Sequence, residues 1–506
     1  MANNNTRTVR PRIVWALTIF AGIIAALGQA PFDLWPVAVV GFGLLYALMR
    51  SSNSTWVAAL TGWLAGCGYF VLTLNWIVEP FMVDVARDGW MAPFALVLIS
   101  AGMALFWGGG FALARLLGGG ALAWIGAMAG VEMARSYVLT GFPWGLIGHS
   151  LIASPLVQWA AVVGAHGLSL LVLLMAVALW RLTQPRPWMA LPLVAGLAVL
   201  AGLGWQMAQQ DVPGRADGAV VRLVQPNAPQ QEKWDPDKSA EFFRRALVAT
   251  SAEPAAGAVR PDLIIWPETS VPTLLEWADD ALSAIAIRAG GTPVVVGIQR
   301  RDDLRLYNSA VLVGDNGQVQ ALYDKHHLVP FGEYLPFGDF LARFGITAFA
   351  AQFGHGYTAG PGARLMDLGT LGQALPLICY EAVFAQDVAA APSRPAFLLQ
   401  ITNDAWFGAF SGPYQHLAQT RLRAIEQGLG LVRAANTGVS AVIDARGHVV
   451  ASLGLGQQGY IDAPLPGALP ATLYSRTGDL PLALGLIGLM IGLRWRVRRA
   501  TNREAL

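Results

Sequence analysis

Long runs of apolar residues, separated by very few charges, fill the first 210 residues of this 506-residue chain. That segment contains no lysine, and its only acidic residues are Asp33, Glu79, Asp84, Asp88 and Glu132. A helix needs about 20 mostly apolar residues to cross a bilayer. By this rule we predict seven spans, at roughly 13–30, 35–49, 55–77, 91–114, 119–138, 156–180 and 188–208, and an eighth at roughly 479–494. The fold must therefore include a multi-pass α-helical membrane domain.

The composition of the whole chain agrees with this prediction. It is 55% hydrophobic and 13% charged, which excludes an ordinary soluble enzyme of this size. The net charge of +2 comes with arginines that gather at helix ends and form no patch, so we predict no nucleic-acid partner. Two cysteines, Cys67 in an apolar run and Cys379, give no disulfide framework.

The positions of the arginines predict the orientation in the membrane. With eight spans, the basic ends all fall on one side: Arg7, Arg10, Arg12, Arg50, Arg115, Arg181, Arg186, Arg494, Arg496, Arg498, Arg499 and Arg503. The positive-inside rule makes that side cytoplasmic. We therefore expect both termini in the cytoplasm and residues 211–477 on the outer face of a bacterial inner membrane, in the periplasm.

The composition changes between residues 211 and 477, where acids, lysines and turn residues alternate with short apolar runs. These runs predict strands at Val220–Gln225, Leu263–Trp266, Val294–Ile298, Ser309–Val313, Ala374–Cys379, Phe397–Thr402, Leu429–Ala434 and Val439–Asp444. Helices are predicted at Asp237–Ser251, Leu274–Ala289 and His416–Glu426. We therefore divide the chain into a membrane domain (1–210), a layered α/β domain (211–477) and a last span with a basic tail (478–506).

Three residues with complementary chemistry each close a strand-like segment of the outer domain. Glu268 follows Trp266-Pro267, Lys325 follows Tyr323-Asp324, and Cys379 ends an apolar run. A thiol nucleophile needs a base to remove its proton and a cation to stabilise the oxyanion that it creates. Together with the membrane domain, these residues point to an enzyme that carries out acyl transfer at a bilayer surface.

Each of the three residues has an ordinary structural interpretation when taken alone. Glu268 can be an acid of a surface loop, and Lys325 can be a solvated lysine of a hairpin. Cys379 can be a structural cysteine, because free cysteines are commonly buried. The chain uses three lysines against 31 arginines, which suggests that an ammonium is needed at Lys325. Glu381 adds little, because alternate residues of a strand share a face with Cys379 in any case.

A metal or cofactor is not predicted. His326 and His327 are adjacent, and neighbours on an extended segment point to opposite sides, so we do not expect them to share a metal. No Cys/His cluster has zinc spacing. The glycine runs 108–110 and 118–120 have no phosphate-binding pattern and are typical of helix packing or turns.

The order and spacing of these motifs resemble the Glu-Lys-Cys triad of the nitrilase superfamily, with 57 residues from Glu268 to Lys325 and 54 more to Cys379. Within that superfamily the chain resembles the apolipoprotein N-acyltransferases. The matching segments are Gln225 through Lys233-Trp234-Asp235, Gly141-Phe142-Pro143-Trp144, Leu328-Val329-Pro330-Phe331-Gly332-Glu333-Tyr334 and Thr402-Asn403-Asp404-Ala405-Trp406-Phe407-Gly408. The resemblance covers essentially the whole chain.

The resemblance implies an αββα sandwich held on the periplasmic side by eight helices. It implies transfer of an acyl chain from a phospholipid, mainly phosphatidylethanolamine, to the N-terminal amine of a lipoprotein's diacylglyceryl cysteine. Carried onto this chain, Glu268 is the general base, Lys325 the oxyanion stabiliser and Cys379 the nucleophile that forms a thioester. Glu333 and Glu381 match supporting carboxylates, and Trp234 and Tyr380 match positions associated with substrate handling.

Other residues keep two interpretations at this point. Phe331, Trp406 and Phe407 either shield a thioester from water or are plain core residues. Trp144 either contacts acyl chains or is a tryptophan of the interfacial belt. Glu132 and Arg135 lie three apart on one helix and can pair, either as a structural pair or facing lipid headgroups.

Two other functions compete with acyl transfer to lipoproteins. A membrane-anchored carbon–nitrogen hydrolase, an amidase or nitrilase, would share the triad, but seven spans before the catalytic domain are more than an anchor needs. A transporter or scaffold with an inert outer domain is the third possibility. Transporters typically have paired broken helices at the membrane midplane, and apart from Glu132 the spans lack charges at their midpoints.

Overall fold

The computed structural model describes residues 11–254, 259–336, 343 and 356–504. Arg7 and Arg10, which contributed to the predicted orientation, lie outside this range. The chain divides into two compact units, one of residues 1–209 with 479–506 and one of residues 210–478. Each unit is described below by itself.

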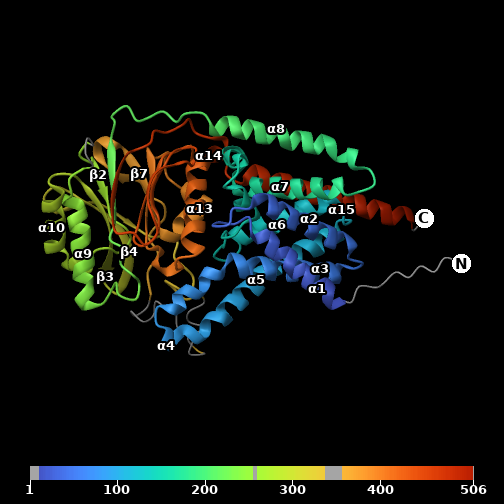
Figure 1. Cartoon of the computed structure of the whole chain (residues 1–506), viewed down its shortest axis with the longest axis horizontal. Coiled ribbons are helices and arrows are strands. Elements are labelled where there is room, and N and C mark those ends of the chain that lie inside the picture. The colour runs from blue at the N-terminus through green and yellow to red at the C-terminus, as the bar shows by residue number, and fades with distance from the viewer. Residues whose placement is uncertain (1–10, 255–258, 337–342, 344–355, 505–506) are drawn as a thin grey trace. The chain divides into compact units, whose positions relative to one another are not determined.

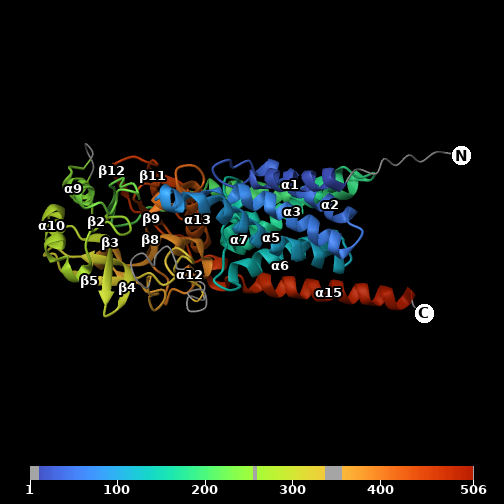
Figure 2. The ribbon, with the colours of Figure 1, turned by 90° about the horizontal axis from the view of Figure 1, so that it is seen from below.

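The first unit is helical, and one long helix lies at each of the eight predicted spans (Figure 1). Over the described residues these helices are α1 (Pro11–Ala26), α2 (Trp35–Ser51), α3 (Thr55–Thr73), α5 (Ala92–Leu116), α6 (Ala121–Tyr137), α7 (Ala160–Leu182), α8 (Leu191–Ala208) and α15 (Leu480–Glu504). Proline occupies the first turn of α2, α5 and α8, where its missing N–H costs nothing. Figure 2 shows α15 as one continuous helix.

Five helical stretches within the described residues are long and apolar enough to cross a membrane: Thr55–Thr73, Val85–Leu116, Pro155–Leu182, Pro187–Ala208 and Leu480–Arg503. Arg12–Ala26 and Trp35–Ser51 are apolar but shorter, and α6, with Glu132 and Arg135, belongs to neither group. The structure thus contains several helices compatible with membrane spans, and the number eight stays a prediction.

Small residues allow the helices of this unit to approach closely. A β-carbon added to Gly22 of α1 would lie 2.0 Å from the carbonyl oxygen of Ala65 in α3, and one added to Gly68 would lie 2.2 Å from that of Ile19. Because apolar surface gives no driving force between helices in lipid, such close packing is a main source of helix association there.

The second unit contains two six-stranded sheets in the part of the chain that the structure describes. The first has the order β12-β1-β2-β3-β4-β5, with β1 (Val220–Gln225), β2 (Leu263–Ile265), β3 (Val294–Asp302), β4 (Arg305–Val313), β5 (Val319–Asp324) and β12 (Gly459–Pro464). The second has the order β11-β10-β9-β8-β7-β6, with β6 (Met366–Asp367), β7 (Gln373–Ile378), β8 (Phe397–Thr402), β9 (Leu431–Ala435), β10 (Ser440–Ile443) and β11 (Val449–Leu453).

Helices cover the outer faces of the two sheets. Apolar residues of α9 (Pro236–Ser251) and α10 (Asp279–Ala289) form a buried core with β1 to β4, and residues of α13 (Gly412–Gln427) do the same with β7 to β10. Figure 1 shows the resulting order of helices, sheet, sheet and helix within this unit. The α/β prediction is confirmed, and all eight expected strands exist; β5, β6, β11 and β12 are not among those eight.

The topology gathers several strand ends at one edge of each sheet. Strands β1, β2 and β3 run parallel, β5 is antiparallel to β4 and therefore follows the direction of β3, and β7, β8 and β9 run parallel. The carboxyl ends of parallel strands meet at one edge, where sites in open α/β sheets are usually found. The residues that directly follow these ends include Lys325 after β5, Cys379 after β7, Asn403 after β8 and Asn436 after β9.

Candidate active site

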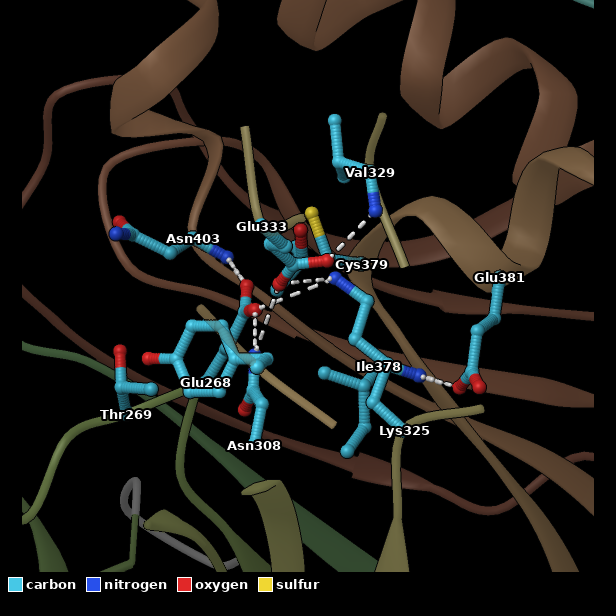
Figure 3. A network of polar contacts seen from close by, with 12 residues as sticks. Glu268, Thr269, Asn308, Lys325, Val329, Glu333, Ile378, Cys379, Glu381 and Asn403 are labelled. Carbon is cyan, nitrogen blue, oxygen red and sulfur yellow. Dashed lines mark hydrogen bonds and ion pairs between the residues drawn. The ribbon is translucent and has the colours of Figure 1, made fainter. Parts of the chain in front are cut away.

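The three residues singled out in the sequence come together in the second unit. Figure 3 shows the side chains of Glu268, Lys325, Glu333 and Cys379 converging on one region. The Lys325 ammonium nitrogen lies 3.8 Å from Glu268 Oε1, and all three predicted triad members are buried. Segments that are more than 50 residues apart in the sequence therefore supply a carboxylate, an ammonium and a thiol to one site.

Lys325 lies between two carboxylates. Its Nζ donates a hydrogen bond to Glu333 Oε1 at 2.8 Å, and Glu333 Oε2 in turn accepts from the backbone N–H of Val329 at 2.8 Å. Burial alone would lower the pKa of Lys325, but the negative charges of Glu333 and Glu268 outweigh it and raise the pKa above its ordinary value. The side chain is therefore a permanent cation, and Glu333 is the group that orients it.

Both oxygens of the Glu268 carboxylate have partners. Oε1 accepts from the Asn308 side-chain amide at 2.6 Å, and Oε2 accepts from the backbone N–H of Asn403 at 2.7 Å. Gly297 in β3 makes room for this loop, because a β-carbon there would lie 2.5 Å from Glu268 Cα. Asn308 and Asn403 were not identified from the sequence as site residues; Asn403 lay in a motif that was quoted, whereas the interior of β4 gave no signal for Asn308.

Cys379 is held in an unusual backbone conformation. Its φ is 53°, in the left-handed region that residues other than glycine rarely adopt, and it opens a 3₁₀ turn, Cys379–Val383. The expectation that Cys379 and Glu381 share one face of a strand is therefore wrong, because β7 ends at Ile378. Burial, and then the Glu268 carboxylate, raise the pKa of the thiol, while Lys325 and a hydrogen bond with Thr402 act to lower it. A thiol with a raised pKa needs a base to become a nucleophile.

A buried polar network fixes the carbonyl of this strained residue. The Gln400 side-chain amide donates to the Cys379 carbonyl oxygen at 3.2 Å and lies 3.1 Å from His416 Nε2. Burial and the Arg433 charge lower the pKa of His416. Its Nδ1 lies 2.9 Å from Asp404 Oδ1, and its Nε2 lies 3.1 Å from the Cys379 carbonyl oxygen. Arg433 completes the network through Asp404 and Gln400 Oε1. The network locks the backbone at the nucleophile.

Glu381 ties the Cys379 turn to the segment that carries Lys325. One of its oxygens accepts from the backbone N–H of Ile378 at 2.7 Å, and the other accepts from the N–H of His326 at 2.8 Å and from the Tyr323 hydroxyl at 2.9 Å. Burial would raise the pKa of Glu381, but the bonds from His326 and the backbone lower it below its usual range. Glu381 therefore acts on the geometry of the site and not on the reacting atoms.

The two adjacent histidines behave differently from the expectation that they point apart. His327 Nδ1 lies 2.7 Å from Asp387 Oδ2, and His326 Nε2 lies 3.9 Å from the same oxygen, so both rings approach one carboxylate. Among the described residues, no group of three or more His, Cys, Asp or Glu side chains is arranged to hold a metal ion.

The aromatic residues predicted to bind substrate fall into two groups. Tyr380 and Phe407 are buried, and Phe407 packs edge-on against His416 as a core residue. Trp234 and Trp406 are each 38% exposed, and Phe331 is 57% exposed, so Trp406 and Phe331 are not enclosed core residues, and an apolar shield over the thiol stays a prediction. Trp234 lines a pocket together with Glu268 and Lys233, a residue to which the sequence analysis assigned no role.

In the helical unit, Trp144 is an interior residue. Its side chain is fully buried and its ring lies 4.5 Å from that of Trp76, so it is neither a belt tryptophan nor exposed to acyl chains in this conformation. Glu132 and Arg135 pair at 3.3 Å and are fully buried, as the spacing predicted. Their burial favours a structural pair over one that faces headgroups.

Comparison with known proteins covers both units. Residues 21–178 match the model of the apolipoprotein N-acyltransferase N-terminal domain, and residues 220–470 match the carbon-nitrogen hydrolase model. Two relatives called apolipoprotein N-acyltransferase are similar along nearly their whole lengths. The one from Rhodopseudomonas palustris is 38% identical, covering 95% of both chains, and the one from Bradyrhizobium diazoefficiens is 39% identical, covering 96% of this chain and 95% of the relative.

Solved structures are similar to part of this chain. An amidase from Nesterenkonia sp. is 21% identical, and the match covers 55% of this chain and 98% of that one with a TM-score of 0.37. The family of the chain follows from the two family models and from the relatives that match along nearly their whole lengths.

Proposed function

The chain belongs to the apolipoprotein N-acyltransferase family, and from this premise we propose that it transfers a fatty acyl chain from a phospholipid to an apolipoprotein. The donor is a phospholipid such as phosphatidylethanolamine. The acceptor is the N-terminal amine of the diacylglyceryl cysteine. The observation that carries the proposal is the meeting of Glu268, Lys325 and Cys379 at one site, in a chain whose other unit consists of long apolar helices.

In the first half-reaction the Cys379 thiolate attacks the ester carbonyl of the phospholipid, after Glu268 takes the thiol proton. The negative charge that develops on the carbonyl oxygen is stabilised by Lys325. In the described part of the chain one acceptor, Glu333 Oε1, is within hydrogen-bonding distance of the Lys325 ammonium, which leaves N–H donors for the oxyanion. The ester C–O bond breaks, Glu268 returns its proton to the leaving alkoxide, and lysophospholipid departs from a Cys379 thioester.

In the second half-reaction the α-amine of the apolipoprotein attacks the thioester carbonyl. Lys325 again stabilises the oxyanion, the C–S bond breaks, and the amine proton passes through Glu268 to the departing thiolate. The products are the N-acylated lipoprotein and the free thiol. Because donor and acceptor react in separate steps, the scheme predicts ping-pong kinetics.

The location of the reaction follows from the same proposal. The positive-inside pattern supports a multi-pass protein of a bacterial inner membrane with both termini in the cytoplasm and residues 211–477 in the periplasm. A reporter enzyme fused near residue 300 should then be active only outside the cytoplasm. Activity of a reporter that works only in the cytoplasm would contradict this orientation.

The decisive experiment isolates the first half-reaction. Purified protein incubated with phosphatidylethanolamine alone should release lysophospholipid once per active site, and mass spectrometry should find a fatty acyl adduct on Cys379. Addition of a diacylglyceryl peptide should remove the adduct and yield N-acyl peptide. Cys379→Ala serves as the control and should form no adduct.

Two results would contradict the proposal. If Cys379→Ser turned over at close to the wild-type rate, a thioester would not be needed. If the adduct decayed to free fatty acid as fast without peptide as with it, the chain would act as a hydrolase.

A further inference from the structure

Lys233 is a buried lysine beside the loop that carries Glu268. The mechanism proposed above gives it no role. It lies between β1 and α9, and it is one of three lysines in the chain. Its side chain is 6% exposed, and its ammonium donates to the carbonyl oxygen of Glu268 at 3.1 Å and to Thr269 Oγ1 at 2.6 Å. Burying an ammonium costs free energy, so its presence here needs a reason.

The loop that Lys233 binds is strained at the residue after the base. Thr269 has a φ of 47°, and a β-branched residue seldom adopts the left-handed region. Such a conformation persists only where neighbouring groups hold it in place. Lys233 bonds both to the carbonyl of Glu268 and to the side chain of Thr269, so it holds the two residues that determine where the Glu268 carboxylate points.

The charge of Lys233 also acts on the reacting groups. The negative charges of Glu268 and Cys379 favour its ammonium form, and by the same interaction the ammonium favours the ionised forms of Glu268 and Cys379. Burial is the larger effect and lowers the pKa of Lys233 to about 8, with the two negative charges raising it in part. The side chain is therefore charged at neutral pH and loses its charge within reach of ordinary assays.

A pocket connects Lys233 to the residue that the family resemblance associates with substrate. Lys233, Trp234, Glu268 and Thr269 are among the residues that line it. The Lys233 ammonium lies 5.5 Å from the centre of the Trp234 ring, within range of a cation–π contact. One side chain thus contacts the loop of the base and the exposed tryptophan of the pocket.

We propose that Lys233 is a positioning residue of acyl transfer, whose ammonium fixes the Glu268–Thr269 loop and adds a second positive charge near the Cys379 thiolate. The proposal rests on the proposed function for the reaction that it serves. Lys325 touches the reacting atoms in that scheme, whereas Lys233 acts through the Glu268 loop and through the field at Cys379.

The sign of the pH dependence follows from the charged state. The groups whose charges act on Lys233 are Glu268 from the loop after β2 and Cys379 from the turn after β7. Lys233 is an ammonium below about pH 8 and neutral above it, so its contribution is present at neutral pH and lost as the pH rises through about 8. The rate of Cys379 acylation should therefore fall on the alkaline side.

The test compares Lys233→Met and Lys233→Arg with Lys238→Met. Lys238 is the matched control, because it is exposed and pairs with Glu232 at 2.9 Å on the surface. The first readout is the rate of Cys379 alkylation by iodoacetamide between pH 6 and 10, measured by mass spectrometry of the Cys379 peptide. This readout needs neither phospholipid nor acceptor, so it separates a failure of this proposal from a failure of the proposed function.

We expect Lys233→Met to slow Cys379 alkylation at pH 7 by about tenfold or more, the effect of a thiol pKa raised by about one unit. Lys238→Met should leave it unchanged. An alkylation profile of folded Lys233→Met that coincides with that of the wild type would overturn the proposal, since a purely structural lysine would not change the thiol.

The second readout is the rate of acylation by phosphatidylethanolamine. Arginine stays charged to far higher pH, so Lys233→Arg should retain the rate at pH 9 relative to its own rate at pH 7, whereas the wild type should lose it. If Lys233→Met does not fold, this comparison still decides the matter. A wild-type acylation rate that stays level from pH 7 to pH 9.5 would overturn the proposal without any variant.

Discussion

Each unit of the molecule buries a carboxylate with a cation, and the two pairs differ in how completely their hydrogen bonds are used. In the helical unit Glu132 and Arg135 lie 3.3 Å apart, and in the α/β unit Glu268 and Lys325 lie 3.8 Å apart. All four side chains are buried. Burial of charge, which is expensive in either place, therefore does not by itself separate a structural pair from a catalytic one.

The partners make the distinction. Arg135 donates to the backbone carbonyls of Phe142 and Trp144 at 2.6 and 2.8 Å as well as to Glu132. Glu132 accepts from Trp107 Nε1 and from the N–H of Ile147, both at 2.9 Å. This pair therefore holds the segment after α6 in place.

Lys325, by contrast, donates to one acceptor in the described residues, Glu333. A buried cation with unused donors is poised to bind charge that appears during a reaction, which is what an oxyanion requires. Arg135 leaves one donor, Nε, without a partner among the described residues, so a spare donor does not by itself mark the active site. The two pairs differ in how many donors remain and in what lies beside them, because the charge of Cys379 acts on Lys325.

The largest effect that tests this contrast is expected for Lys325→Met. Loss of the oxyanion donor should lower the rate of Cys379 acylation by about 10³-fold, or about 4 kcal/mol of transition-state stabilisation. The measurement is single-turnover release of lysophospholipid, with thermal unfolding of the same preparation. The contrast would be contradicted if Lys325→Met lowered the unfolding temperature as much as Arg135→Met does while the folded Lys325→Met protein kept its acylation rate.

The next effect is expected for Arg135→Met. It is smaller in free energy, and it changes the stability of the protein instead of the reaction rate. Removal of the guanidinium leaves Glu132 as an uncompensated buried charge, which should destabilise the protein by about 3 kcal/mol. The double variant Glu132→Gln, Arg135→Met should recover part of that loss, because no lone charge remains. Thermal unfolding in detergent provides the measurement, and Arg87→Met, at an exposed arginine, is the control. Unchanged unfolding of Arg135→Met would show that the pair has no structural role.

The smallest expected effect is a pH-dependent change in Tm that depends on His326 of the α/β unit. Burial lowers the pKa of His326, but Glu381 and Asp387 outweigh it and raise the pKa above its usual value. A raised pKa in the folded state contributes stability that is full below the unfolded value of about 6.5 and is lost as the pH rises through the folded value. Wild-type Tm should thus fall as the pH rises above about 6.5.

The variant His326→Gln should lack this decline, with a difference of the order of 2 °C. Glu381 has the opposite sign: its lowered pKa contributes stability above about pH 4.3 and loses it on acidification. That slope should become shallower in the variant, because the His326 side chain is lost while the backbone N–H groups of Ile378 and His326 still bind Glu381. Parallel Tm curves for wild type and His326→Gln above pH 6.5 would contradict the assignment.

Much of the fold could be predicted because it depends on local pattern. Apolar runs marked all eight long helices, and short buried runs marked the central strands, since both faces of such strands are covered. The edge strands β11 and β12 gave no such signal, because their residues are largely exposed or partly exposed. Cys379, Glu268 and Lys325 were found because each closes an apolar strand.

Residues that act through distant contacts could not be found in the same way. Asn308 and Lys233 contact the Glu268 loop from 40 and 35 residues away. Nothing around Asn308 in the sequence marks it, and Lys233 lies in a motif of the family resemblance that gives it no role. The positive φ of Cys379 could not be predicted from the sequence either, because it depends on hydrogen bonds between the turn and the side chains of Gln400 and Glu381.

The sequence by itself determined which segments are apolar enough for membrane helices, which are strands of an α/β unit, and which three chemistries close those strands. These properties follow from composition and periodicity along the chain, which are local. Only the tertiary structure decided that Glu132 and Arg135 are enclosed, that Trp144 is an interior residue, and that Lys325 keeps donors for a reaction. Burial and hydrogen-bond saturation depend on which distant residues surround a group, and that depends on the packing of the folded chain.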